Sequence, residues 1–276
     1  MNNIDSLHII SQEDFKADKV DVWGIDDKNL FLEANQVLSK QQKPFFAIIQ
    51  TADNHPPYTI PAQDLGAFKK VNYPKDSIAK YGFNSIEQLN AFRYTDFCFQ
   101  QFFAAAQKEK YFDNTIFVFV GDHGIPGNST EMYPESWTEQ NLNNEHVPLL
   151  FYAPKILVPQ QLHQACSQLD IMPSVAHLLK APYRNNAMGK DLFDSSFLQK
   201  DYAFVIDHER KTIGIVNSKY YYVKNLKTGM VNLVSVTGNA AVPRSPQTDS
   251  IKNAMGKFAE AYYETSKYLL FNNRKK

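Results

Sequence analysis

Hydrophobic and polar positions in the first two thirds of the chain form two kinds of pattern that alternate. Short apolar runs with the length of buried strands cover Phe45–Thr51, Thr115–Val120 and Val147–Tyr152. Between the first two runs, apolar residues recur near the helical period from Ile86 to Lys108. Strands that alternate with helices predict the α/β class, with a mostly parallel central sheet.

After about Asp201 the pattern changes to short strands separated by turn signals, which predicts an antiparallel meander. Helical spacing over Ile251–Phe271 then predicts a final helix that covers this small sheet. We therefore expect residues 1–200 to form the main part of the fold. Residues 201–276 would form a carboxyl-terminal antiparallel subdomain and helix within the same structural domain. The four expected strands are Phe204–Ile206, Thr212–Val216, Tyr220–Val223 and Val231–Val234.

Composition excludes some classes of partner. The chain has 276 residues, and 43% of them are hydrophobic, enough to bury a large core. Lysine plus arginine equals aspartate plus glutamate, 29 against 29, so no net field draws the chain to nucleic acid or to an anionic membrane. Residues 1–15 show no cationic start followed by an apolar stretch, and no apolar run approaches the ~20 residues of a membrane helix. We therefore expect a chain made on its own to remain in the cytoplasm.

Three further residues are expected to be structural. Asp170 precedes a helical segment, Ile171–Lys180, and is the expected cap of that helix. Cys98 and Cys166 stand in apolar patterns, without the close pairing of a zinc site. We interpret both cysteines as core residues, because free cysteine usually packs as a small hydrophobe.

The turn Gly121-Asp122-His123-Gly124 carries the most chemical information. It follows the strongest expected strand, and ligands of open parallel sheets gather beyond the carboxyl ends of strands. Asp122 and His123 offer one oxygen and one imidazole nitrogen to the same point, which suits a divalent metal ion. Two residues make only half a metal site, so a capped turn with a surface aspartate and histidine remains the alternative.

Two other histidines are candidates for substrate binding. His55 follows the first apolar run, so the topology brings it towards the same edge of the sheet, with Asn54 beside it. Histidine titrates near neutrality and can protonate a leaving group or hydrogen-bond a phosphoryl or sulfuryl oxygen. His146 precedes an expected strand, but the polar stretch before it is long enough to fold back over the sheet edge. For both, a loop or structural histidine is the alternative.

No residue has the setting of a nucleophile. Thr51 ends an expected strand, but the prolines that follow prevent the helix amino terminus that would activate it. Ser77 follows Asp76 as in an aspartate-serine pair, but no buried strand leads into it. We therefore expect the chain to hold only part of an active site.

Together, these motifs resemble the carboxyl-terminal part of the catalytic domain in the lipoteichoic-acid synthase and phosphoglycerol transferase family, which is classed with the sulfatases. The resemblance is ordered and spans about Val22 to Phe193. The residues that carry it are Val22-Trp23-Gly24 with Asp27, Leu30-Phe31, Pro44-Phe45-Phe46, Asn54-His55-Pro56-Pro57-Tyr58, Asp113-Asn114-Thr115, Gly121-Asp122-His123-Gly124, His146-Val147-Pro148-Leu149-Leu150 and Asp170-Ile171-Met172-Pro173.

This resemblance implies an alkaline-phosphatase-like fold, a three-layer α/β/α sandwich with a small carboxyl-terminal antiparallel sheet, in which residues 1–200 are the later portion of the catalytic domain. Asp122 and His123 would hold one divalent metal ion, manganese as the first expectation and zinc or magnesium as alternatives. His55 would contact the phosphate-bearing substrate, with Asn54 and His146 as further substrate-binding candidates. By the resemblance, the family's metal-binding glutamate and nucleophilic threonine would lie upstream of Trp23-Gly24, and we expect this chain to lack the elements that carry them.

The resemblance also implies a function for an intact parent protein. A metal-activated threonine would attack phosphorus, and an acceptor hydroxyl or water would resolve the covalent intermediate. The substrate would be a phosphate or sulfate ester, lipid- or glycan-linked, at the outer face of the cytoplasmic membrane, to which amino-terminal helices anchor relatives. Two alternatives stay open: a phosphatase or sulfatase of small esters, and a non-catalytic remnant that binds metal or an anionic glycan.

Overall fold

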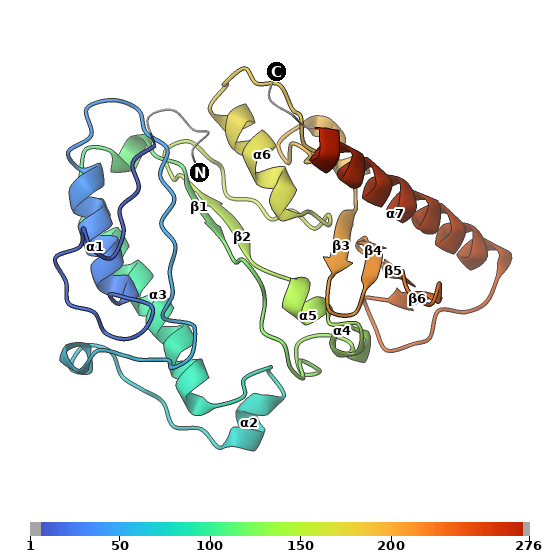
Figure 1. Cartoon of the computed structure of the whole chain (residues 1–276), viewed down its shortest axis with the longest axis horizontal. Helices are drawn as coiled ribbons and strands as arrows, with labels where there is room; N and C mark the ends of the chain where they lie inside the picture. The colour runs from blue at the N-terminus through green and yellow to red at the C-terminus, as the bar shows by residue number, and fades with distance from the viewer. Residues whose placement is uncertain (1–6, 273–276) are drawn as a thin grey trace. The chain divides into compact units, whose positions relative to one another are not determined.

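The computed structural model of the chain describes residues 7–272, which form two compact units (Figure 1). The first unit comprises the described residues within Met1–Phe119 together with Leu149–Val158. The second comprises Val120–Pro148 and the described residues within Pro159–Lys276. Among the described residues, no helix combines the length and the apolar character needed to cross a bilayer.

The first unit is built around two helices that lie side by side, α1 and α3 (Figure 1). Along α3, the side chains of Tyr94, Cys98 and Phe102 recur every fourth residue and are almost fully buried, as the helical spacing in the sequence predicts. Phe31 of α1 packs against Phe102, with ring centroids 5.1 Å apart. The helices of this unit are α1 (Asp27–Leu38), η1 (Ala62–Asp64), α2 (Lys75–Ala79), α3 (Ile86–Ala106) and η2 (Phe112–Asn114).

Two of the three apolar runs form strands, which pair with each other: β1 (Phe117–Val120) and β2 (Leu149–Tyr152). Phe103 of α3 covers them, with its ring 5.3 Å from that of Phe117. The prediction of a strand at Phe45–Thr51 is wrong, because this segment is irregular and Phe46 and Ile48 are 66% and 83% exposed. An apolar run becomes a strand only where another strand hydrogen-bonds to it, and local sequence does not contain that information.

The second unit contains the antiparallel meander that the sequence predicts, in the order β3-β4-β5-β6. Helix α7 lies along one face of it (Figure 1), where Ile215, Tyr222, Met255 and Ala259 form a buried cluster. The strands and the helix are β3 (Ala203–Asp207), β4 (Thr212–Val216), β5 (Tyr220–Asn225), β6 (Val231–Ser235) and α7 (Pro246–Asn272). Short helices complete the unit: α4 (Glu135–Glu139), α5 (Leu142–Glu145), η3 (Gln168–Asp170), α6 (Ile171–Leu178) and η4 (Ser195–Gln199).

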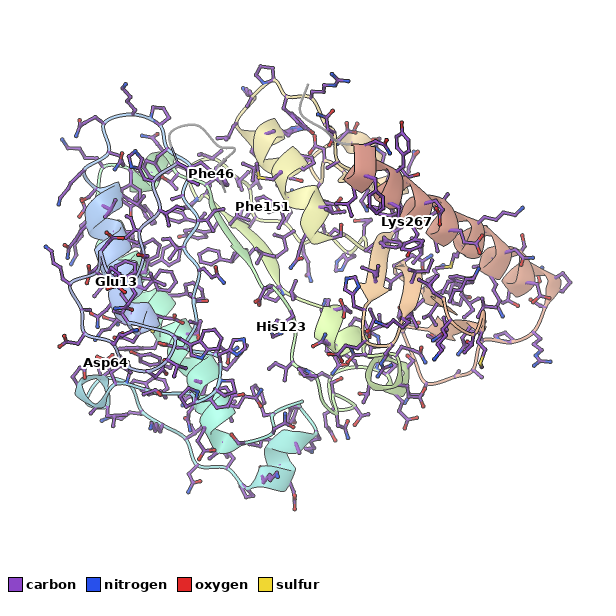
Figure 2. The ribbon with its side chains drawn as sticks, in the orientation of Figure 1. Glu13, Phe46, Asp64, His123, Phe151 and Lys267 are labelled. Atoms are coloured by element: carbon purple, nitrogen blue, oxygen red, sulfur yellow. The ribbon has the colours of Figure 1, made fainter. Side chains whose placement is uncertain are left out.

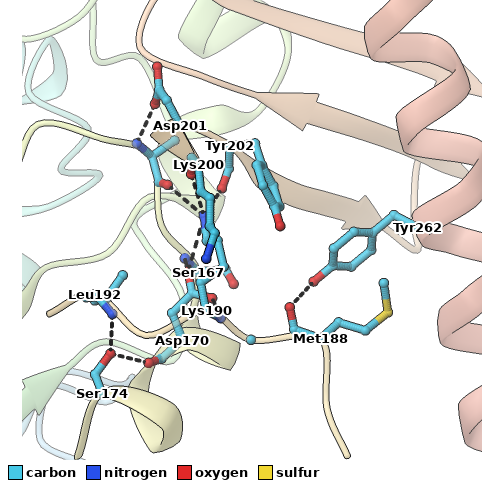
Figure 3. A network of polar contacts seen from close by, with 12 residues as sticks. Ser167, Asp170, Ser174, Met188, Lys190, Leu192, Lys200, Asp201, Tyr202 and Tyr262 are labelled. Atoms are coloured by element: carbon cyan, nitrogen blue, oxygen red, sulfur yellow. Dashed lines mark hydrogen bonds and ion pairs between the residues drawn. The ribbon is translucent and has the colours of Figure 1, made fainter. Parts of the chain in front are cut away.

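Asp170 precedes α6, but its side chain does not cap that helix, contrary to the sequence prediction. Its carboxylate instead accepts hydrogen bonds from the backbone N–H of Ser167 (2.8 Å) and of Lys190 (2.6 Å), and it forms a capping box with Ser167 at the start of η3. The buried ammonium of Lys190 lies 3.7 Å from Asp170 and donates to the carbonyl oxygens of Ala165 and Lys200 (Figure 3). This network joins η3 to the segment that leads into β3.

The two cysteines differ. Cys98 is fully buried in α3, as predicted. Cys166 is exposed, so the prediction that it is a core residue is wrong. It lies in an irregular segment before η3, where an apolar neighbourhood in sequence does not place a side chain on a packed face.

Candidate functional site

Asp122 and His123 lie in an irregular turn directly after β1, and Figure 2 labels His123 on that segment. Their side chains are 83% and 54% exposed, so solvent and ligands reach both. The backbone N–H of His123 donates to Oδ1 of Asp122 at 2.9 Å. Oδ2 of Asp122 lies 3.9 Å from Nε2 of His123, a separation that two ligands of one metal ion can have at metal–ligand distances of about 2.0–2.2 Å.

The hydrogen bonding of His123 favours one tautomer. Nδ1 lies 2.9 Å from the carbonyl oxygen of Gly124, which can only accept a hydrogen bond, so Nδ1 carries the proton and the lone pair is on Nε2. Metal-binding histidines usually show this arrangement, with the non-coordinating N–H on a backbone carbonyl or a carboxylate. Asp122 and His123 therefore fit two positions around a divalent metal ion. Across residues 7–272 no group of three or more His, Cys, Asp or Glu could hold a metal ion.

Two features outside the pair hold the turn in place. The side-chain amide of Gln168, in η3, donates to the carbonyl oxygens of Gly121 (2.6 Å) and Asp122 (3.1 Å). Gly124 donates its backbone N–H to Asn144 at 2.6 Å, and a Cβ at Gly124 would collide with the backbone oxygen of Asn143. Sequence reasoning missed Gln168, which lies 46 residues from Asp122.

His146 lies at the end of α5, and its segment folds back so that its backbone oxygen is close to Gly124. Its Nδ1 is 3.2 Å from the hydroxyl of Tyr133, and the rings of Tyr133 and Trp137 stack at 4.3 Å beside it. Partial burial lowers the pKa of His146. At neutral pH the imidazole is therefore the neutral form, in which one ring nitrogen donates a hydrogen bond and the other accepts one.

His55 and Asn54 belong to the first unit, in the irregular segment after Phe45–Thr51. Both are exposed, and the imidazole of His55 lies against the indole of Trp23, with ring centroids 4.6 Å apart. The indole N–H of Trp23 donates to the carbonyl oxygen of Pro56 at 2.8 Å. Trp23 therefore contacts both His55 and the residue that follows it.

The structure thus brings Asp122 and His123 together in one turn and packs Gly124 against the segment that ends at His146. His55 and Asn54 are described within the other unit. Of the hydroxyls weighed as nucleophiles, Thr51 is in an irregular segment, and that of Ser77 donates to the carbonyl oxygen of Pro74 at 2.7 Å in α2.

Comparison with known proteins places these observations in a family context. The sequence profile of the sulfatase family, described as Sulfatase, matches residues 3–181. The chain is 25% identical over 222 residues to the lipoteichoic acid synthase of Staphylococcus saprophyticus, covering 73% of this chain and 33% of that protein. It is 28% identical over 184 residues to lipoteichoic acid synthase 1 of Bacillus subtilis, covering 63% of this chain and 27% of that protein. The chain thus spans about a third of the length of these relatives.

Solved structures show the fold. Ps i-CgsB in complex with k-i-k-neocarrahexaose matches with a TM-score of 0.62 at 18% identity, over 86% of this chain and 54% of that one. The phosphonate monoester hydrolase SpPMH of Silicibacter pomeroyi matches with a TM-score of 0.55 at 14% identity, over 87% of this chain and 60% of that one. The predicted fold class is confirmed: the chain has the alkaline-phosphatase-like α/β fold of the sulfatases, including the small antiparallel sheet.

Proposed function

The chain belongs to the sulfatase family, and we propose that it supplies metal-binding and substrate-binding residues for chemistry on phosphate or sulfate esters. The finer proposal is transfer of a phosphoglycerol or phosphoethanolamine group to a lipid- or glycan-linked acceptor of the cell envelope. Two similar proteins named lipoteichoic acid synthase support this choice of substrate class. The place of action would be the outer face of the cytoplasmic membrane.

The observation that carries the proposal is the geometry of the Asp122-His123 turn. One carboxylate oxygen and one imidazole nitrogen lie 3.9 Å apart, and Nδ1 of His123 is held by a carbonyl. A divalent ion bound there, manganese first and zinc or magnesium as alternatives, would supply Lewis-acid stabilisation of charge on the ester oxygens. The proposal assigns no nucleophile to this chain.

The other candidate residues would act on the ester directly. His55 would donate a hydrogen bond to a phosphoryl or sulfuryl oxygen, or a proton to the leaving group, because imidazole titrates close to neutral pH. Asn54 would donate through its side-chain amide. His146, whose pKa is lowered, would bind as a neutral imidazole, so it suits a hydroxyl of the acceptor better than an anionic oxygen.

The experiment that tests the proposal is calorimetric titration of the full chain with MnCl₂ and ZnCl₂. We expect binding with a stoichiometry of one, and Asp122→Ala should weaken it by about 100-fold or more, because a lost ligand costs more than a lost supporting contact. Asp191→Ala is the matched control. It removes the carboxylate from another aspartate-histidine pair, in which Oδ2 of Asp191 lies 2.6 Å from Nδ1 of His177.

Turnover of bis-nitrophenyl phosphate by the same preparations completes the test. Metal binding that depends on Asp122, without turnover, is the expected result. Turnover by the chain alone would show that a nucleophile lies within it, and would overturn that part of the proposal. Metal binding equally weakened by Asp191→Ala, or unaffected by Asp122→Ala, would remove the basis for the proposed site.

A further inference from the structure

The segment that carries Asn54 and His55 is irregular, yet side chains hold it firmly at its amino-terminal end. Oδ1 of Asp27 accepts from the backbone N–H of Ala52 at 2.8 Å, and Oδ2 of Asp27 accepts from that of Asp53 at 3.3 Å. Oδ2 of Asp53 accepts in return from the backbone N–H of Asp27 at 2.8 Å. We call this reciprocal arrangement of Asp27 and Asp53 the aspartate clasp.

The clasp is buried: Asp27 is 1% exposed and Asp53 is 8% exposed. A buried carboxylate is costly unless hydrogen bonds satisfy it, so each of the three backbone bonds stabilises the segment against the start of α1. The other titratable groups that interact electrostatically with the two carboxyls are Asp21, Asp26 and Cys98. Two nearby charged groups have partners of their own: Asp26 accepts a hydrogen bond from the hydroxyl of Tyr94, and Lys28 forms an ion pair with Asp64.

The other end of the segment is held from the same stretch of chain. Trp23 lies four residues before Asp27, and its indole both packs on the His55 ring and donates to the carbonyl oxygen of Pro56. Gly24, between them, has φ of +119°, a conformation that favours glycine. The stretch from Trp23 to Asp27 therefore contacts the segment before His55 through Asp27 and after His55 through Trp23.

We propose that Asp27 and Asp53 are positioning residues, whose reciprocal backbone hydrogen bonds hold His55 against Trp23 in the place from which it contacts a phosphate or sulfate ester. This inference rests on the proposed role of His55 in substrate binding. The clasp itself touches no substrate. Because it sets the position of an exposed imidazole through buried bonds, its loss should weaken substrate binding without removing any group that contacts the ester.

The clasp is also sensitive to alkaline pH. Burial, and then the negative charge of Asp27, raise the pKa of Asp53 to about 8, and burial raises the pKa of Asp27 to about 6. Near neutral pH, Asp53 therefore retains its proton and the pair carries a single negative charge. Above about pH 8 two buried negative charges face each other across the clasp, and repulsion should release the segment.

The test uses Trp23 as the reporter. The chain has two tryptophans, so Trp137→Phe leaves Trp23 as the single fluorophore. In that background, Asp53→Ala should shift the emission of Trp23 to longer wavelength and raise its quenching by acrylamide, because the segment no longer covers the indole. Asp53→Asn should preserve the emission, since the amide oxygen of asparagine can still accept from Asp27. The parent should show the same shift above about pH 8, and Asp53→Asn should not.

Asp64→Asn is the matched control, because Asp64 is another buried carboxyl of the same unit, bonded to Tyr94 and Lys28 and not to the segment. It should leave the emission of Trp23 unchanged while the chain remains folded by circular dichroism. An unchanged emission in folded Asp53→Ala, or an equal shift in Asp64→Asn, would overturn the proposal.

A binding arm separates this inference from the proposed function. With Trp137 intact, calorimetry with glycerol phosphate and MnCl₂ should show about a tenfold weaker affinity in Asp53→Ala, restored in Asp53→Asn. If Asp53→Ala releases Trp23 but His55→Ala leaves the affinity unchanged, the clasp stands and the role of His55 fails. If His55→Ala abolishes binding while Asp53→Ala leaves both readouts unchanged, the role of His55 stands and the clasp proposal is overturned.

Discussion

At the scale of single residues, the turn at Asp122 and His123, which we propose binds a metal ion, contacts a side chain that lies far from it in sequence. Gln168 is exposed, but its amide donates to the two carbonyl oxygens that precede His123. Gln168 lies in η3, and Ser167 and Asp170 form a capping box at the start of this short helix. The buried ammonium of Lys190 forms an ion pair with Asp170. The orientation of Asp122 is thus connected to a buried ion pair through one glutamine.

We predict that Gln168→Ala weakens the binding of Mn²⁺ to the chain by about tenfold, the size of effect typical for groups that orient metal ligands. The reason is that the carbonyl oxygens of Gly121 and Asp122 lose their hydrogen bonds from the Gln168 amide, so the turn gains conformational freedom while Asp122 and His123 remain. Calorimetric titration measures this directly. Gln247→Ala, an exposed glutamine in the first turn of α7, is the control and should leave the affinity unchanged. Equal affinities for the parent and Gln168→Ala would contradict the role given to Gln168.

Sequence could indicate Asp122 and His123 because their signal is local: an apolar strand, a glycine on each side, and two ligand types between. It could not indicate Gln168, whose contact with the turn spans 46 residues. The same holds for the aspartate clasp. Asp27 belongs to the motifs that carry the family resemblance, but only the fold shows that the carboxylates of Asp27 and Asp53 accept hydrogen bonds from each other's backbone N–H groups.

At the scale of elements, helix α7 packs against one face of the antiparallel sheet in the second unit. Met255 and Ala259, one helical turn apart, are 8% and 0% exposed and pack with Ile215 and Tyr222 of the sheet. On the other side of the sheet, Tyr221 packs with Leu142 of α5. Successive side chains of β5 point to opposite faces of the sheet, so Tyr222 packs against α7 and Tyr221 packs against α5.

We predict that Met255→Ala lowers the free energy of unfolding by about 2–3 kcal/mol, because it removes buried methylene groups and leaves a cavity between α7 and the sheet. Urea unfolding followed by circular dichroism measures the change. Met230→Ala is the matched control: the same substitution at a residue that is 74% exposed, where the change should stay within about 0.5 kcal/mol. Similar losses for the two variants would mean that α7 does not pack on the sheet as described.

The elements that sequence predicted correctly are those with a complete pattern of their own. The four strands of the meander are short apolar runs that turn residues separate, and helical spacing covers Ile251–Phe271, most of α7. Phe45–Thr51 has an equally apolar run, but it is not a strand in the described structure. Pairing requires a neighbour, and no spacing within six or seven residues tells whether one is present.

At the scale of the whole molecule, the formal net charge is zero, yet the buried carboxyl groups are unevenly distributed along the chain. Asp26, Asp27, Asp53 and Asp64 are all at most 8% exposed and all lie in the first unit. Burial raises the pKa of Asp53 and Asp27 to about 8 and about 6, from 3.8. The folded chain therefore binds protons that the unfolded chain has already released at the same pH.

The difference in bound protons between the folded and the unfolded chain determines whether the free energy of unfolding rises or falls with pH. A carboxyl whose pKa is raised on folding contributes stability that is fully present below its unfolded pKa, near 4, and is lost as pH rises through its folded pKa. The window for Asp27 ends near pH 6 and that for Asp53 near pH 8. His146 acts in the opposite direction: because its pKa is lowered on folding, the folded chain gains stability as pH rises towards the ordinary pKa of histidine.

We predict that the free energy of unfolding of the parent chain falls between pH 5 and pH 8 relative to that of Asp53→Asn, by an amount on the order of 3 kcal/mol. Taking the difference between the two proteins cancels His146 and the other titratable groups that are not coupled to Asp53. Urea unfolding at pH 5, 6, 7 and 8 measures it, and the two curves should converge towards low pH, where Asp53 is protonated in both states. Parallel pH dependences would show that Asp53 ionises as it does in the unfolded chain. A parent that gained stability relative to Asp53→Asn as pH rises would mean that a cation, and not burial, controls the carboxyl.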